Sequence, residues 1–313
     1  METGSSLWGS SPHKPFPCVS GDIALSRQAR SLWGKSDGGE GACWLPLYMH
    51  MLDSTGIAGY LWDEWLPEGT RALFVQALGG DPCCARKLAC FIAGVHDIGK
   101  ATPSFQGMPC GKGGFTLDHK PRKAGLPFRP EVTGHRRVSH PMGSYLVLLD
   151  ILVRDYGWQA ACAESIAAVV GGHHGKPPAG EDDPVKIRAE VMPQVYGLGW
   201  DKGCAEAWTA VQVELVTLVA LAAGLTHEEL VSFANTFVPA PVASLLTGYV
   251  IMADWLASDQ TLFPLVSNGY DDEGEDGRGL RMQPSTWDDV SRQVAGAWQR
   301  AGLIPAWHED AVP

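Results

Sequence analysis

Residues 94–100 read Gly-Val-His-Asp-Ile-Gly-Lys, and this stretch decides how the rest of the chain is interpreted. It follows residues 83–93 (CCARKLACFIA), an apolar run of the kind that forms helices. We therefore expect His96 and Asp97 to lie in the last turns of a buried helix that Gly99 ends. Neighbouring helical positions point about 100° apart, so the two side chains cannot grip a single ion in one simple bidentate contact. They can instead serve two neighbouring metal ions, the imidazole binding one and the carboxylate bridging both.

Apolar segments with helical spacing fill most of the chain, and no stretch shows sustained alternation of apolar and polar residues. The predicted fold class is therefore all-α. Helices are predicted over residues 23–33, 45–65, 71–78, 82–99, 140–156, 159–170, 205–225, 228–237, 241–258 and 286–301.

Histidines and acids recur at the ends of these apolar segments, inside them, or beside the glycine pair at 171–172. An uncompensated polar group in such a place is costly, so each needs a partner. Taken singly, His50 or His140 is explained as a hydrogen-bonded core residue. Together, in a chain with 10 histidines, the residues fit a binuclear metal site drawn from at least five helices. The candidate ligands are His50, His96, Asp97, His140, His173, His174 and Asp254.

The donor types in this set indicate the chemistry. Imidazole-rich ligation with a bridging carboxylate suits Fe(II), Mn, Co, Ni or Zn better than calcium or magnesium. Two such cations roughly 3.5 to 4 Å apart orient a phosphodiester and activate water, so phosphoester hydrolysis is the expected reaction. Lys100 is placed to offer a cation to the charge that develops on phosphate. Its alternative role is that of a lysine favoured at a helix C-terminus by the helix dipole.

Composition excludes several other classes. With 45% hydrophobic and 19% charged residues among 313, the chain is expected to be a soluble globular protein. The longest apolar run, residues 215–225, is too short to span a bilayer, and no export signal is visible at the start. Eight cysteines without a Cys-x-x-Cys pair are read as reduced thiols. We therefore expect a cytoplasmic protein without a membrane role.

Charge is unevenly distributed along the chain. The formal net charge of −11 argues against a surface that coats nucleic acid non-specifically. Residues 112–137 nevertheless carry seven Lys or Arg against Asp118 and Glu131. This Gly- and Pro-rich segment is either a solvated loop or a phosphate-contacting strip beside the active site. The acidic run at 271–276 is expected to be a solvated loop.

Six segments resemble a known family, the HD phosphohydrolase superfamily, and within it the HD nuclease domain of the CRISPR-associated nuclease-helicase of type I interference systems. The run after the His-Asp pair is the most specific of them, and the segments follow the family's order from residue 32 to residue 258. The segments are LWGKS (32–36), LYMHMLD (47–53), HDIGKATPSFQ (96–106), SHP (139–141), GHHG (172–175) and ADWLAS (253–258).

The resemblance implies an HD-domain helical bundle with a dinuclear metal site in its core. His50, His96, Asp97 and Asp254 would hold one ion, and Asp97, His140, His173 and His174 the other. Iron(II) is the native ion that relatives suggest, with Mn, Co or Ni as substitutes. Asp97 and Lys100 would be catalytic, and Lys100 and Ser258 match positions near the bound strand.

The activity that this family implies is endo- and exonucleolytic cutting of single-stranded DNA, which degrades invader DNA. The implied partners are single-stranded DNA, the guide-RNA surveillance complex and a helicase domain or subunit. Residues 1–20 are expected to be disordered and residues 21–270 to form the nuclease domain. Residues 271–313 would pack on that domain or lead to a helicase that this chain lacks. The alternatives are an HD-type nucleotide phosphohydrolase or phosphodiesterase, and a non-catalytic adaptor with a structural metal.

Overall fold

The computed structural model describes residues 15–16, 18–37, 43–110, 114–128, 138–176, 195–197, 203–267 and 280–304. The acidic run at 271–276 lies outside these described residues, as do residues 112–113 and 129–137 of the basic segment. Most of the predicted disordered N-terminus, residues 1–14 and 17, also lies outside them.

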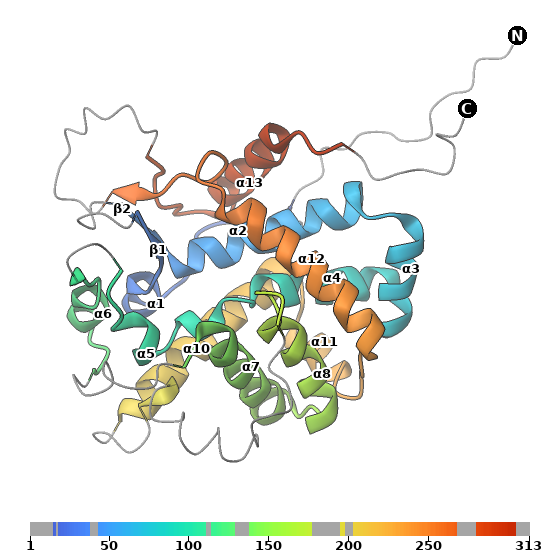
Figure 1. The fold of residues 1–313 in the computed structure, drawn as a ribbon, viewed down its shortest axis with the longest axis horizontal. Helices are drawn as coiled ribbons and strands as arrows, with labels where there is room; N and C mark the ends of the chain where they lie inside the picture. The colour runs from blue at the N-terminus through green and yellow to red at the C-terminus, as the bar shows by residue number, and fades with distance from the viewer. Residues whose placement is uncertain are drawn as a thin grey trace, which may run out of the picture.

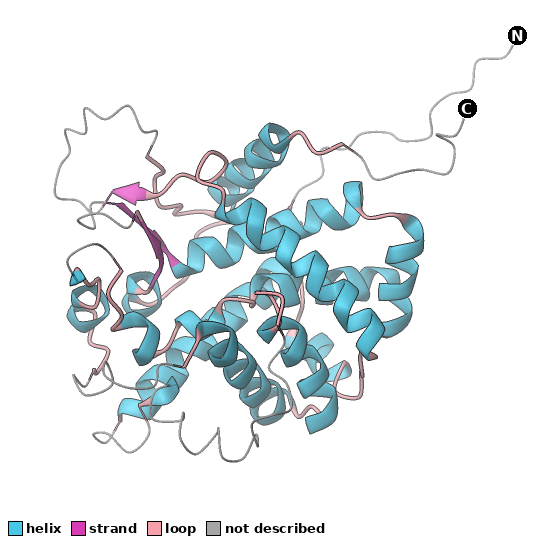
Figure 2. Cartoon of the chain, viewed as in Figure 1, coloured by secondary structure: helices cyan, strands magenta, loops and turns pink. Residues whose placement is uncertain are grey.

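Helices dominate the described chain, and strands occur only at one edge of it (Figure 2). This confirms the all-α class. The helices are α1 (Arg27–Ser31), α2 (Leu47–Tyr60) with its π-helical extension η1 (Leu61–Trp65), α3 (Glu68–Ala77), α4 (Pro82–Gly94), the 3-10 turn η2 (Ile98–Lys100), α5 (Pro103–Gln106), α6 (His119–Lys123), α7 (His140–Tyr156), α8 (Ala160–Gly171), α10 (Cys204–Ala223), α11 (His227–Ser232), α12 (Ala240–Ser258) and α13 (Trp287–Ala301); the strands are β1 (Trp33–Ser36), β2 (Cys43–Pro46) and β3 (Val266–Ser267).

Helix α2 forms the centre of the bundle, because all 14 of its residues are buried. A helix that is apolar on every side belongs inside a protein rather than at its surface. α4, α10, α12 and α13 pack around it, and α7 and α8 form a pair beside this group (Figure 1). α8 also contacts α4 and α12. The ends of α2, α4, α7, α8 and α12 thus belong to one packed core.

Three short strands accompany the helices of the described residues, in a chain whose sequence shows no sustained apolar and polar alternation. They form a small antiparallel sheet in the order β1-β2-β3, in which Trp33 pairs with Pro46 and Trp44 with Val266. Strands of two to four residues are too short for an alternating pattern to be visible in the sequence. The helix predicted over 23–33 is correspondingly limited to α1, because Trp33 begins β1.

The C-terminal helix was predicted over 286–301, and α13 confirms it. Thr286 caps the helix: its hydroxyl accepts from the Asp289 N–H while the Asp289 carboxylate accepts from the Thr286 N–H. The apolar face of α13 packs on α2. Phe16 is buried against Trp287, with ring centroids 5.8 Å apart, so the prediction of disorder through residue 20 is wrong at Phe16.

Two helices, α10 and α12, are long and apolar enough to cross a membrane by length and composition alone. Both pack in the bundle, α10 against α2 and α4 and α12 against α2 and α8. A long helix in the core of a folded domain passes the same test; half of the apolar window of α10 is buried, against 28% of that of α12.

Candidate metal centre

The His-Asp pair lies just beyond a helix, not inside it. α4 ends at Gly94, which corrects the prediction that the helix continues to Gly99. In a continuing helix the Ala93 carbonyl would accept from the N–H of residue 97. Here the His96 ring contacts it instead, with Nδ1 2.7 Å from the carbonyl oxygen. The His96 side chain thus donates to one of the carbonyls that the end of the helix leaves without a backbone donor. The chain then continues into η2 through hydrogen bonds between residues three apart.

Gly94 allows this turn to sit deep in the bundle. A Cβ on Gly94 would lie 2.1 Å from the Thr55 hydroxyl oxygen and 2.5 Å from a Val219 methyl. Only a residue without a side chain lets the end of α4 approach α2 and α10 so closely.

The same arrangement occurs where α8 ends at Gly171. The His173 ring contacts the Val170 carbonyl, with Nδ1 2.6 Å from the oxygen. A carbonyl oxygen only accepts hydrogen bonds, so Nδ1 carries the proton in both His96 and His173. The Nε2 atoms of the two rings are therefore the ones available to a ligand.

His140 is the first residue of α7, and a close backbone contact fixes its position. The Gly99 N–H donates to the Ser144 hydroxyl at 2.8 Å. A Cβ on Gly99 would lie 2.1 Å from the His140 carbonyl oxygen and 2.3 Å from the Ser144 nitrogen. Gly99 therefore serves to bring the His-Asp turn against the N-terminus of α7, a role different from the predicted helix stop.

The seven candidate ligands come together in two groups. In each group, one potential ligand atom per residue lies within 4.8 Å of the corresponding atoms of the others. The groups are His50, His96, Asp97 and Asp254, and His140, His173 and His174. The family resemblance assigns the same residues to the two ions and, in addition, assigns Asp97 to the second ion.

Asp97 faces both groups, one with each carboxylate oxygen. Its Oδ2 lies 3.1 Å from His50 Nε2 and 3.4 Å from His96 Nε2. Its Oδ1 lies 3.5 Å from His140 Nε2 and 3.6 Å from His173 Nε2. A carboxylate in this position is suited to bridge two ions.

Asp254 completes the first group from α12. Its Oδ1 is 3.3 Å from the Nε2 atoms of both His50 and His96. In the second group the Nε2 atoms of His140 and His174 are 3.2 Å apart. The second group thus consists of imidazoles, with Asp97 as its neighbouring carboxylate.

Four atoms in these groups are buried and make no hydrogen bond within the described chain: His50 Nδ1 and, facing one another, His96 Nε2, His173 Nε2 and Asp97 Oδ1. Buried polar atoms are nearly always hydrogen-bonded, so three that face one another need an explanation. Each is a lone-pair donor of a type that transition metals prefer. The residues therefore fit a pair of divalent transition-metal ions.

Charges in the first group are strongly coupled. Burial opposes ionisation of Asp97, but Lys100 and His96 hold the pKa of its carboxyl well below the usual range. Burial likewise opposes ionisation of Asp254, and His96 and His50 nevertheless lower its pKa. Burial alone would lower the pKa of His96, yet the carboxylates of Asp97 and Asp254 raise it to about 10. Without metal, a protonated imidazole thus supplies the positive charge between two carboxylates.

The second group has the opposite tendency. Burial lowers the pKa of His140 to about 4, with Asp97 opposing and Lys100 adding to the effect. Burial and the neighbouring His96 lower the pKa of His173 to about 3. Both rings are therefore neutral at physiological pH, the state in which imidazole binds a metal.

The two residues predicted near the substrate contact the ligands themselves. The Lys100 ammonium is 2.6 Å from Asp97 Oδ2. The Ser258 hydroxyl donates to Asp254 Oδ1 at 2.9 Å. Both side chains hold a candidate ligand in place, and both lie at the margin of the centre.

Two residues of the matched motifs contribute more than the sequence indicated. Gln106 is fully buried and links β1 to the His-Asp turn, and Lys35 on β1 reaches the end of α12. Their motifs were visible, but their roles depend on a strand that is too short to predict. Asp53 of the same helix as His50 is in neither ligand group and pairs with Arg281.

The described part of the basic segment, residues 114–128, packs against aromatic rings. Lys120 of α6 lies 4.1 Å from the ring centroid of Trp44, and Arg122 lies 4.5 Å from that of Phe128. Whether the segment contacts phosphate stays a prediction.

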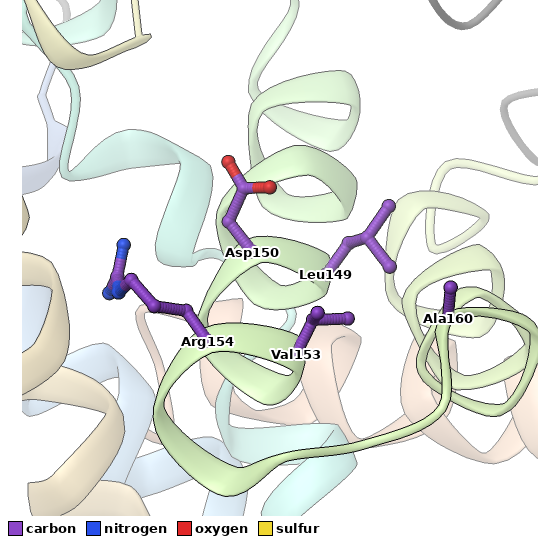
Figure 3. Close-up of a pocket in the computed structure, with 5 residues that line it drawn as sticks. All are labelled: Leu149, Asp150, Val153, Arg154 and Ala160. Atoms are coloured by element: carbon purple, nitrogen blue, oxygen red, sulfur yellow. The ribbon is translucent and has the colours of Figure 1, made fainter.

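A separate surface hollow of about 420 Å³ lies beside α7 and the start of α8, away from the ligand groups. Leu149 and Val153 point toward Ala160, while Asp150 and Arg154 point to the other side (Figure 3). Asp150 already accepts a hydrogen bond from the Tyr196 hydroxyl at 2.7 Å. This hollow has no cluster of ligand or nucleophile side chains, so the chemistry is assigned to the metal centre.

Comparison with known proteins identifies relatives of this arrangement. The sequence model of the family described as "Cas3, HD domain" matches residues 33–263. The CRISPR-associated nuclease/helicase Cas3 of Streptococcus thermophilus is 29% identical over 231 residues, which cover 72% of this chain and 24% of that protein. The CRISPR-associated endonuclease/helicase Cas3 of Thermus thermophilus is 32% identical over 244 residues, covering 77% and 23%. The chain thus spans about a quarter of the length of these curated relatives.

Solved structures share the fold. A crystal structure described as a CRISPR-associated protein matches with a TM-score of 0.67 and 26% identity. The match covers 94% of this chain and 29% of the chain in that crystal structure. The HD domain of Thermus thermophilus Cas3, crystallised in the presence of Ni²⁺, has a TM-score of 0.53 and 24% identity, and covers 89% of this chain and 92% of its own. The helical arrangement is therefore that of an HD domain.

Proposed function

Because this chain belongs to the Cas3 HD-domain family, we propose that it is a metal-dependent nuclease that cuts single-stranded DNA in type I CRISPR interference. The observation that carries the proposal is the position of Asp97, whose two oxygens face two separate groups of histidine and acidic side chains. The relatives named above are described as nucleases joined to helicases, which supports the same activity.

Each group would hold one divalent ion, with Asp97 shared. His50, His96 and Asp254 are the other ligands proposed for the first ion, and His140, His173 and His174 for the second. Bound ions would supply Lewis acidity toward a phosphodiester and activate water for its attack. Iron(II) suits this donor set, as do manganese, cobalt and nickel. The Thermus relative's crystallisation with Ni²⁺ agrees with that range.

The chain's own residues would position the strand and its phosphate. Asp97 fixes the spacing of the two groups, and the neutral rings of His140 and His173 offer lone pairs without having to lose a proton. Lys100, beside Asp97, would stabilise negative charge on the phosphate as it reacts. Ser258 keeps Asp254 oriented and lies at the edge where a strand would enter. Recognition through phosphates would make cutting independent of base sequence.

Partners follow from the length of the relatives. The relatives that this chain matches over about a quarter of their length are described as nuclease/helicases, so we propose that a helicase domain or subunit delivers the strand. A guide-RNA surveillance complex in the cytoplasm would supply the opened DNA.

Replacing Asp97 by Asn tests the proposal. We expect Asp97→Asn to lower cleavage of single-stranded DNA by more than about 100-fold, because removal of a shared ligand disturbs both ions. Asp155→Asn is the matched control, since Asp155 lies near the far end of α7 and pairs with Arg154 on the surface. The assay uses protein purified without oxygen and loaded with Mn²⁺, with a chelator added to a parallel sample.

Two outcomes would contradict the proposal. Turnover of nucleotides with DNA left intact would indicate a nucleotide phosphohydrolase. Bound metal without turnover of either substrate would indicate an adaptor with a structural metal.

A further inference from the structure

Lys35 lies at the metal centre although no ligand role requires it. It belongs to β1, and its ammonium donates to the carbonyl of Ser258, the last residue of α12, at 2.8 Å. The Ser258 hydroxyl in turn donates to Asp254 Oδ1. Lys35 is therefore one residue removed from the first ligand group.

Gln106 fixes Lys35 relative to Lys100. The Trp33 N–H donates to Gln106 Oε1 at 3.1 Å, and the Gln106 amide donates to the carbonyls of Trp33 at 2.8 Å and Lys100 at 2.9 Å. Gln106 is fully buried, so these bonds are shielded from water. The strand that carries Lys35 and the turn that carries Lys100 are thus joined by one side chain.

Two ammonium groups on one margin of a site repel each other unless negative charge lies between them. Burial and the nearby charge of Lys100 lower the pKa of Lys35, while Asp254 and Asp97 oppose that shift. If those two carboxylates bind divalent ions, the ions neutralise their negative charge. The margin then carries net positive charge, which an anionic group of the substrate complements.

We propose that Lys35 binds a backbone phosphate of the single strand, next to the phosphate that lies at Asp97 and Lys100. The inference rests on the proposed nuclease function and names one contact of that substrate. An ammonium has three N–H groups, and within the described residues Lys35 uses one of them, on the Ser258 carbonyl. The remaining two are available to non-bridging oxygens, and a point charge of this kind does not distinguish bases.

A structural role would look different. A lysine on the last carbonyls of a helix also stabilises that helix and would keep Asp254 in place through Ser258. Such a role predicts weaker metal binding when the charge is removed. It predicts no dependence on any particular phosphate of the strand.

Lys35→Met and Lys35→Arg separate the two roles, because Met keeps the length of the side chain and Arg keeps its charge. Binding of a fluorescent single-stranded oligonucleotide is measured by anisotropy over a range of salt concentrations, with Mn²⁺ bound and with nuclease-resistant phosphorothioate linkages in the strand so that nothing is cut. We expect Lys35→Met to weaken binding by about tenfold. In Lys35→Met the slope of log affinity against log salt should become shallower by about 0.7, the value for one phosphate contact. Lys35→Arg should keep most of the affinity and most of the slope of the unaltered protein.

Lys87→Met is the matched control. Lys87 is also a partly buried lysine, but its ammonium contacts Glu229 at 2.6 Å, between α4 and α11. Its removal should leave the salt slope unchanged.

A second measurement locates the contact. Single phosphates of the oligonucleotide are replaced by neutral methylphosphonates, and KM is measured with Mn²⁺. One replacement should raise KM for the unaltered protein and have no further effect on Lys35→Met. Mn²⁺ affinity, measured by electron paramagnetic resonance without DNA, should be the same in both proteins.

The inference is overturned if Lys35→Met keeps its salt slope and its response to every methylphosphonate. A loss of Mn²⁺ affinity in that variant would assign Lys35 to the structural role. Failure of the unaltered protein to bind or cut the strand would instead refute the proposed nuclease function, so the two failures are distinguishable.

Discussion

Asp97 divides its two oxygens between the two ligand groups, and this division has a measurable consequence. We expect Asp254→Asn and His174→Ala each to reduce bound metal from about two ions per chain to about one, because each belongs to a single group. Asp97→Asn should reduce it further, since it belongs to both. Metal content by mass spectrometry of the purified protein measures this, and circular dichroism checks that the helices persist. Loss of both ions in either single-group variant would show that the groups do not bind independently.

Gly99 has almost no room for a side chain. We expect Gly99→Ala to destabilise the fold by about 2–3 kcal/mol or more, because the new Cβ meets main-chain atoms of α7 that cannot rotate away. Denaturant unfolding of the metal-free protein measures the change. Gly248→Ala is the control, since a Cβ there meets nothing within 4 Å and α12 should gain up to about 1 kcal/mol. Equal stability of the two variants would contradict the close contact.

At the scale of residues, all seven side chains that the sequence singled out lie in the two groups, whereas their local setting was predicted poorly. Histidines and acids at the ends of apolar segments are recognisable, because a polar side chain in a segment that is expected to be buried costs free energy unless it has a partner. The exact end of α4 was missed, because His96 itself replaces the backbone donor on the Ala93 carbonyl. The pattern of apolar residues does not show whether a backbone N–H or a side-chain ring donates to that carbonyl.

Among the helices, α13 offers a test through the pH dependence of its cap. Hydrogen bonds from the Thr286 hydroxyl and backbone lower the pKa of the Asp289 carboxyl. A lowered folded-state pKa stabilises the fold above the ordinary value of about 3.9, and this contribution disappears as pH falls through the lowered value. We therefore expect Asp289→Asn to unfold at lower urea concentration than the unaltered protein at pH 7.

That difference should shrink when unfolding is repeated at a pH below the lowered pKa of Asp289, because the carboxyl is then neutral, as an asparagine side chain is. Asp288→Asn serves as the control, since Asp288 is not one of the two partners of the capping box. A difference that stays constant between the two pH values would rule out the carboxylate as the cause.

At the scale of elements, long helices were predictable and short elements were not. The helices predicted over 241–258 and 286–301 match α12 and α13 closely, because many turns repeat the same apolar spacing. β1 and β2 are set by partners instead: Gln106 holds Trp33, and the strands pair with each other. Such partners lie far away in the sequence.

Across the whole molecule, a buried ion pair joins residues 228 positions apart. Arg281 donates to both oxygens of Asp53, with Nη2 2.7 Å from Oδ1, and so ties the C-terminal segment to α2. We expect Arg281→Met to cost about 3–5 kcal/mol, because it leaves the buried Asp53 carboxylate without its partner. Urea unfolding measures the loss. The double variant Asp53→Leu with Arg281→Met should recover most of it, and a double variant as unstable as the single one would contradict the explanation.

Contacts of this range are what the sequence alone does not supply. Nothing in the sequence near Asp53 or Arg281 identifies the other as its partner. Phe16 was likewise assigned to a disordered end, since its partner Trp287 lies near the opposite end of the chain.

The contact of Gly99 with the start of α7 also bears on how the ion preference of such a centre could be redesigned. Main chain rests on main chain there, so the second group and the bridging carboxylate form one stiff unit. Asp254 comes from α12, a separate helix on which Leu245 and Trp255 are exposed. Substitutions around Asp254 could therefore change which cation the first group prefers, while the second group keeps its preference and provides the comparison within the same protein.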